Sequence, residues 1–277
     1  MKKTFLFLSI FIFGILFSQT NRFIYELKYK SDSLQEEFEI AEMVLDINPK
    51  DVEFYEYGFI EIDSLRKLPE KLNHQYTSQT GQTISRKKGT NLNSNYAQIR
   101  MMPYYYVFET SDEMKWKIEK ETKNLENYKL QRATTNFGGR EWIAWFSSDI
   151  PISEGPYKFR GLPGLILFLE DSKQNFVFSF KRNKNLQKTF DTSEFIENHY
   201  GMNPIKVSPK KWEKLNLDFF NDPYSRMRTE FKPDWNVQIN GRKIKAKEEF
   251  NELTKSTQDD IRKYYNPIEL DKAINYP

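Results

Sequence analysis

The chain contains no cysteine and only two histidines, His74 and His199, among its 277 residues. Without cysteine no disulfide can form, so the hydrophobic core alone must hold the fold together. The same scarcity argues against zinc, copper and iron sites and excludes a nucleophile built from a cysteine–histidine pair. Both histidines have polar neighbours and no second ligand at a useful spacing. We therefore expect surface positions for both, and no metal or cofactor.

Long apolar runs are nearly absent, and the exception lies at the start of the chain. In MKKTFLFLSIFIFGILFS two lysines precede an apolar run from Phe5 to Phe17. The run has about 13 residues, short of the roughly 20 that a membrane-spanning helix needs, and is typical of a secretory signal peptide. We expect cleavage near Ser18 and a periplasmic or secreted mature protein, residues 19–277. It would form a single domain without a transmembrane segment.

An excess of charge of either sign is lacking too. Without the two lysines of the signal peptide, 40 basic residues face 39 acidic ones. A balanced chain that is exported is a poor candidate for a nucleic-acid binder, so we expect no such partner. Two basic stretches, residues 206–214 and 241–247, have acidic residues among or after them. We interpret both as solvated faces.

Aromatic residues are plentiful, at 16% of the chain, and many alternate with polar ones. Such alternation is typical of strands with one packed face. It predicts strands at residues 22–30, 43–47, 52–57, 104–109, 114–119, 128–137, 140–147, 165–170 and 176–180. The fold class expected is mainly β with a few helices, a β-rich α+β protein built on a curved, half-barrel-like antiparallel meander sheet.

Glycine is scarce, with 11 residues, yet it gathers at two turns between these strands. Gly138 and Gly139 match a two-residue hairpin, whose central positions need positive φ. The second turn lies in GPYKFRGLPGLI, residues 155–166, which fits no phosphate-binding glycine motif. Pro163 and Gly164 there predict a type II turn with positive φ at the glycine. We interpret the stretch as a rigid corner that contains Gly155, Pro156, Gly161, Pro163 and Gly164.

Helical patterns are confined to the C-terminal region, from about residue 193. Residues 250–265 have helical spacing and abundant Glu, Lys and Gln, residues 193–200 suit a short helix, and residues 208–220 show no clean period. Residues 77–98 are polar and hold glycine and serine with few apolar anchors, so we expect a mobile loop there.

The hexapeptide GLPGLI, Gly161–Ile166, resembles the signature of the GLPGLI family, exported proteins of Bacteroidetes. The resemblance extends upstream through residues 133–159, with matching spacing, and is strongest over roughly residues 114–181. It implies an envelope or secreted protein. It implies no activity, since the family has no established biochemical function, cofactor or catalytic residue.

A non-enzymatic binding protein is the function we expect from the side chains near this corner. An apolar or amphipathic ligand, or another envelope protein, would be its partner. Lys158 and Arg160 could meet an anionic headgroup or a carboxylate, although the neighbouring aromatic residues could also be ordinary core. The candidate ligand-binding residues are Trp142, Trp145, Phe146, Tyr157, Lys158, Phe159, Arg160 and Leu162.

Two alternatives stay open. A periplasmic hydrolase could use paired carboxylates near the corner, drawn from Asp149, Glu154, Glu170 and Asp171. No nucleophile, base and orienting partner can be named together, so we assign no catalytic residue and do not expect an enzyme. The chain could instead be a structural or partner-binding subunit of an envelope assembly, recruiting its partner by strand addition at an edge or through residues 77–98.

Overall fold

The structure is a computed structural model and describes residues 20–69, 73–125, 127–232, 234–239 and 241–277. The predicted signal peptide lies outside the described residues. The main feature is one 12-stranded sheet. Its strands are β1 (Thr20–Tyr29), β2 (Glu39–Ile47), β3 (Asp51–Glu56), β4 (Thr83–Lys87), β5 (Leu92–Gln98), β6 (Tyr105–Ser111), β7 (Lys117–Leu125), β8 (Tyr128–Phe137), β9 (Arg140–Ser147), β10 (Leu165–Asp171), β11 (Phe176–Leu186) and β12 (Ile205–Lys206).

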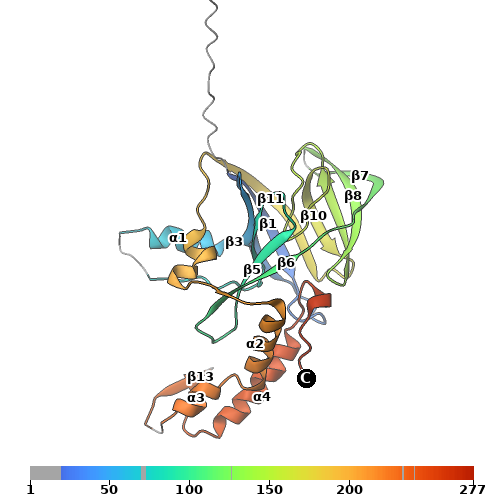
Figure 1. Cartoon of the computed structure of the whole chain (residues 1–277). Coiled ribbons are helices and arrows are strands. Elements are labelled where there is room, and N and C mark those ends of the chain that lie inside the picture. Colours follow the sequence, from blue (N-terminus) through green and yellow to red (C-terminus); the bar gives the residue numbers. More distant parts are fainter. Residues whose placement is uncertain (1–19, 70–72, 126, 233, 240) are drawn as a thin grey trace, which may run out of the picture.

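The sheet is curved and open (Figure 1), with the strand order β12-β6-β5-β4-β3-β2-β1-β11-β10-β9-β8-β7. Two meanders, β1–β6 and β7–β11, are joined by antiparallel pairing of β1 with β11. The short β12 pairs in parallel with β6. The mainly β, curved antiparallel fold class predicted from the alternating aromatics is therefore confirmed.

Both faces of the sheet are covered in its middle. On one face Phe23 and Leu27 of β1 lie in the main core, as their period-two spacing predicts. On the other face Tyr55 of β3 packs against Phe59 of helix α1 (Gly58–Arg66) and Phe195 of the π-helix η1 (Ser193–Glu197). The Phe59 and Phe195 rings stack with centroids 5.7 Å apart. This second layer ties the segment after β11 to the N-terminal meander.

The C-terminal region carries the longer helices and lies below the sheet in Figure 1. Ser208 caps α2, since its side chain accepts a hydrogen bond from the backbone N–H of Lys211 at 3.2 Å. None of the helices in the described ranges has the length and hydropathy to span a bilayer. The elements that follow η1 along the chain are η2 (His199–Gly201), α2 (Pro209–Asn221), α3 (Ser225–Glu230), the hairpin β13 (Val237–Ile239) and β14 (Arg242–Ile244), α4 (Glu249–Lys263) and η3 (Leu270–Lys272).

The mobile loop predicted at residues 77–98 is wrong, because this stretch contains β4 and β5. Both strands are paired on each side, within the order β6-β5-β4-β3. Ahead of them, the backbone N–H groups of Gln79 and Thr80 donate to the carboxylate of Glu56, at 3.1 and 2.8 Å. These backbone hydrogen bonds order residues 77–98, although the side chains of this segment show no apolar pattern.

The predicted hairpin at Gly138 and Gly139 is confirmed, with φ of 62° and 72°. The type II turn predicted at Pro163–Gly164 is wrong, because the positive φ belongs to Gly161, at 97°. Gly164 is needed for a different reason. A Cβ atom on it would lie 2.1 Å from the carbonyl oxygen of Ser147, so β10 begins in a close backbone approach to the end of β9.

Candidate functional site: a cleft beside the glycine-rich corner

A cleft of about 650 Å³ lies next to the corner that ends at Gly164. Strands β5 and β6 form one side, together with the start of α2. Residues 265–274 form the opposite side, and we call them the C-terminal strap. Tyr157 and Lys158, from the corner, and residues 80–82, ahead of β4, complete the lining. The cleft therefore brings together segments that are distant in the sequence.

One wall of the cleft is aromatic. Tyr96 of β5, Phe108 of β6 and Trp212 of α2 line it. The Phe108 and Trp212 rings stack with centroids 5.4 Å apart and planes at 20°. Because Ser208 caps α2 four residues earlier, the turn that carries Trp212 is fixed in place. The wall thus offers a broad apolar surface.

The C-terminal strap is held by groups of the glycine hairpin and β9. The backbone N–H of Leu270 donates to the Gly138 carbonyl at 2.6 Å. The Arg140 guanidinium donates to the carbonyls of Ile268 and Pro267, at 3.2 and 2.8 Å. A Cβ atom on Gly138 would come within 3.0 Å of the Glu269 Cα. The hairpin glycines therefore serve the turn and also make room for the strap.

A buried ionic network forms the floor, with Lys158 at its centre. The Lys158 side chain is only 1% exposed, and its ammonium lies 2.6 Å from Glu269 Oε1. It also lies 3.3 Å from Asp112 Oδ2 and donates to Thr110 Oγ1 at 3.1 Å. Of its three N–H donors, two make hydrogen bonds, to Glu269 and Thr110, and Asp112 adds an ion pair. The Lys158 ammonium is therefore committed mainly to groups within the protein.

Tyr157 and Lys272 complete the floor. Tyr157 has a left-handed backbone, with φ of 56°, and its hydroxyl donates to Glu269 Oε1 at 2.6 Å. Burial, followed by the negative charge of Glu269, raises the pKa of Tyr157 well above its usual value. Lys272 contacts Asp112 at 2.6 Å and also pairs with Glu269. Two lysines thus balance two carboxylates, and the floor has no net charge.

This network predicts an acid-sensitive fold. Burial raises the pKa of Asp112, but Lys158, together with hydrogen bonds from Lys272 and Thr110, outweighs burial and lowers this pKa to about 2 from its ordinary 3.8. The folded-state pKa lies below the unfolded one, so the stabilisation is complete above about pH 4 and is lost as the pH falls towards 2. Urea midpoints at pH 5, 3 and 2 should show this loss, roughly 2 kcal/mol from this carboxyl. An Asp112→Asn variant should lose less stability over the same range, and parallel curves for the two proteins would contradict the assignment.

The structure separates the eight sequence-predicted binding residues into three groups. Tyr157 and Lys158 line the cleft. Arg160 lies beside it, where its guanidinium donates to the Asn91 side chain and to the Asp112 carbonyl. The others lie in the main hydrophobic core, where they pack against neighbouring strands: Trp142, Trp145, Phe146, Phe159 and Leu162. A binding role for the predicted set stays a prediction.

The four carboxylates considered for hydrolysis do not meet in the cleft. Glu154 pairs with Arg86. Asp171 pairs with Arg140, at 3.2 Å, so the hairpin arginine is buried against a carboxylate. The remaining two accept local hydrogen bonds: Asp149 from the Lys129 backbone and the Ser147 hydroxyl, and Glu170 from Gln174. Among the residues described, no group of three or more His, Cys, Asp or Glu could hold a metal ion.

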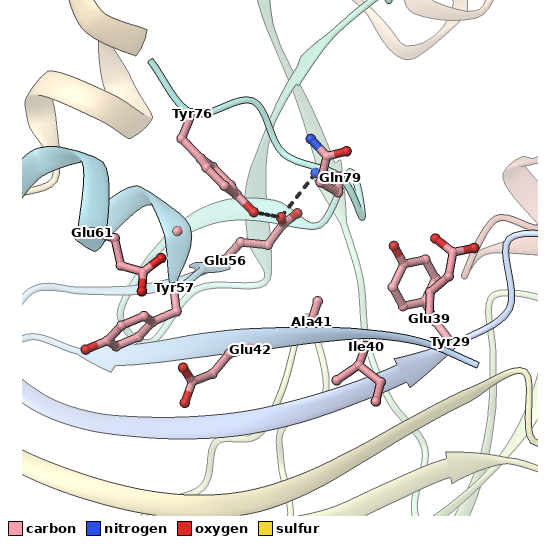
Figure 2. Close-up of a pocket in the computed structure, with 11 residues that line it drawn as sticks. Tyr29, Glu39, Ile40, Ala41, Glu42, Glu56, Tyr57, Glu61, Tyr76 and Gln79 are labelled. Carbon is pink, nitrogen blue, oxygen red and sulfur yellow. Dashed lines mark hydrogen bonds between the residues drawn. The ribbon is translucent and has the colours of Figure 1, made fainter. Parts of the chain in front are cut away.

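A separate hollow of about 540 Å³ lies over β2 and the start of α1 (Figure 2). Its best-buried carboxylate, Glu56, lies beneath Tyr76 and Gln79 and accepts hydrogen bonds from the Tyr76 hydroxyl, at 2.5 Å, and the Gln79 backbone, at 3.1 Å. Glu42, also in its lining, pairs with Arg182 of β11 at 2.5 Å. These acids already have partners that order the fold, so we place the candidate site in the cleft.

Sequence reasoning missed most of the cleft. Glu269 lies 111 residues from Lys158, and Lys272 lies 160 residues from Asp112. No local pattern links such positions. Trp212 stood in a stretch without helical period, although Ser208-Pro209 before it is an N-terminal helix signal.

Comparison with known proteins gives a match to a family model and similarity to solved structures. The family model described as "Protein of unknown function (Porph_ging)" matches residues 138–168, from the glycine hairpin into β10. This segment supplies Gly138, Arg140, Tyr157 and Lys158, which hold the strap and the floor. A search of curated proteins found no significant match.

Two solved structures of PNGF-II, in C2 and P21 space groups, are similar to the chain with 13% identity and a TM-score of 0.49. They cover 72% and 71% of this chain, which spans about a third of their length, 32% and 33%. At this level of similarity they carry no argument about function.

Proposed function

We propose that the chain is a non-enzymatic binding protein that holds an apolar or amphipathic small molecule in the cleft. The observation that carries the proposal is the cleft itself. Its volume of about 650 Å³ falls in the size range of ligand sites, roughly 300–1,000 Å³, and an aromatic wall faces a polar floor. Such a combination suits a ligand with an apolar body and a polar end.

The same floor argues against hydrolysis. A general acid or base needs a proton that it can exchange with a substrate, within hydrogen-bond reach. Here Lys158 donates to Glu269 and Thr110 and pairs with Asp112, and Glu269 accepts from Tyr157 and Lys158 on one oxygen and from Lys272 on the other. The network therefore serves to fix the strap and to present a neutral polar surface.

Export is part of the proposal, since the apolar start of the chain and its resemblance to the GLPGLI family both favour it. A ligand in that setting would come from the periplasm or the cell exterior. Strand addition at β7, an edge of the sheet, is less well supported. The strand carries Lys117, Glu119, Lys120, Glu121 and Lys123, and such charges discourage edge pairing.

The proposal predicts that a molecule co-purifies with the protein and depends on Trp212. The full chain, expressed for export and purified without detergent, should release a stoichiometric small molecule on solvent extraction, detected by mass spectrometry. Trp212→Ala should lose most of it, because the aromatic wall loses its largest ring. A matched control is Trp235→Ala, since Trp235 is 40% exposed and does not line the cleft.

Either of two results would contradict the proposal. One is a wild-type chain that releases nothing; the other is a Trp212→Ala chain that keeps the molecule as well as the control does. Far-ultraviolet circular dichroism of each variant shows that the comparison is made between folded proteins.

A further inference from the structure

A second hollow, of about 200 Å³, adjoins the cleft and shares Tyr96, Phe108 and Trp212 with it. We call it the His199 chamber. Half of its twelve lining residues carry an aromatic ring. These are Phe59, Tyr96, Tyr105, Phe108, His199 and Trp212. Their rings come from α1, β5, β6, η2 and α2, so the chamber lies where the second layer of the fold meets the C-terminal helices.

His199 is buried here, so the surface position expected from the sequence is wrong for this residue. It is 1% exposed, and its ring stacks on Tyr105 with centroids 4.5 Å apart and planes at 20°. Phe59 meets it edge-on at 6.4 Å. Burial lowers the pKa of His199, with the backbone carbonyl of Phe195 opposing the effect, so the ring is neutral at pH 7.

Three side chains of the chamber wall keep unpaired polar atoms. The Tyr105 and Thr83 hydroxyls make no hydrogen bond to any residue that the structure describes, and the ring nitrogens of His199 make none of normal geometry, although the Phe195 carbonyl lies near the ring. Each of the three residues is less than 5% exposed. A buried polar group without a partner carries an uncompensated desolvation cost, which a ligand group that reaches it would recover.

The chemistry of the wall restricts what can bind. Among the described residues that line the chamber, none is charged, so an ionic ligand would find no counter-charge. The three unpaired groups, a neutral imidazole and two hydroxyls, can each donate or accept. Six of the twelve lining residues carry rings, and four more are polar without a ring: Thr77, Ser78, Thr83 and Gln98. The excess of rings favours an aromatic ligand with few polar substituents, because most hydroxyls of a sugar would lie against rings.

We propose that the His199 chamber binds one uncharged aromatic ring that bears a few hydrogen-bonding substituents, such as a phenol or an indole. The ring would form one end of the ligand whose remainder lies in the cleft. This second statement rests on the proposed function, whereas binding of the ring itself does not.

The test uses phenol and indole as probes of the full chain, with titration calorimetry as the readout. Tyr105→Phe and Thr83→Val each remove one unpaired hydroxyl and keep the shape of the side chain. We expect each to weaken binding of the probe that uses that hydroxyl by about fivefold. The melting temperature of the free protein should stay unchanged or rise, because no bond within the protein is lost. Tyr104→Phe is the matched control, since the neighbouring Tyr104 is 47% exposed and does not line the chamber.

The proposal would be overturned if neither probe bound, or if both probes bound Tyr105→Phe and Thr83→Val as tightly as they bind the control. It would also be overturned if methyl glucoside bound more tightly than indole. A lower melting temperature for both Tyr105→Phe and Thr83→Val would count against it too, because the hydroxyls would then have partners within the protein.

The two proposals can fail separately. If the extracted molecule depends on Trp212 but the chamber variants leave its retention and the probe affinities unchanged, the binding function stands and the chamber assignment falls. If nothing co-purifies yet indole binds and responds to Tyr105→Phe, the chamber is a site and the binding function proposed for the cleft is wrong.

Discussion

Replacing Lys158 with methionine is expected to destabilise the protein by about 3–5 kcal/mol, the usual cost of removing one partner of a buried ion pair. Methionine keeps a long unbranched side chain but removes the charge that lies 2.6 Å from Glu269 and 3.3 Å from Asp112. Both carboxylates stay buried, with side chains 8% and 4% exposed. Urea unfolding, followed by circular dichroism, gives the change in the free energy of unfolding.

Lys272→Met is the matched control for this experiment. Lys272 pairs with the same two carboxylates, but its side chain is 42% exposed. Water can therefore replace much of the stabilisation that its ammonium gives to the carboxylates. A partly exposed pair contributes about 0–1 kcal/mol. Equal losses for Lys158→Met and Lys272→Met would mean that burial of the Lys158 ammonium is not what stabilises the floor.

The strands could be predicted because their signal is local. In β1 the period-two spacing of Phe23, Tyr25 and Leu27 predicts that these three share a face, and all three lie in the main core. Gly138-Gly139 likewise specifies a hairpin through the φ angles it permits. By contrast β4 and β5 carry mostly polar side chains and are ordered by pairing with β3 and β6, which is a tertiary effect.

The candidate site could be predicted only in part, for the same reason. Tyr157 and Lys158 stood out because they lie in an unusual glycine-rich corner. Their partner Glu269 lies in a C-terminal strap with no motif of its own. The aromatic residues of the corner could be core or binding surface from sequence alone, and the fold places Phe159 against Trp142, with ring centroids 4.6 Å apart.

The burial of His199 is the clearest case of a feature that could not be predicted from the sequence. Its sequence neighbours are Asn198 and Tyr200, which suggest a wet surface. The residue is buried because η1 and η2 fold back onto the sheet, where Phe59 and Tyr105 enclose its ring. The chain turns here with positive φ at His199 and Tyr200, 32° and 59°. Neither position is a glycine, so the sequence gives no sign of this turn.

Gly164→Ala is expected to cost about 3 kcal/mol, at the upper end of the range for overpacking. The added Cβ would lie 2.1 Å from the Ser147 carbonyl oxygen and 2.6 Å from its carbon. These are backbone atoms where β9 ends, so they cannot rotate away as a flexible side chain could. Relief requires β10 to move from β9, which would disturb the core positions Leu165 and Ile166. The free energy of unfolding in urea is the measurement.

Gly161 supplies the control that separates steric overlap from backbone conformation. Its φ is 97°, but the nearest atom to an added Cβ is 3.8 Å away, on Trp116, so Gly161→Ala should cost only the conformational penalty of about 1–2 kcal/mol. Asparagine tolerates positive φ better than alanine does, so Gly161→Asn should be milder than Gly161→Ala. At Gly164 the order should reverse, because asparagine adds more atoms to a position with no space. If Gly164→Asn instead proved milder than Gly164→Ala, the corner would be a turn that needs positive φ at Gly164, and the close approach to Ser147 would not be what demands glycine there.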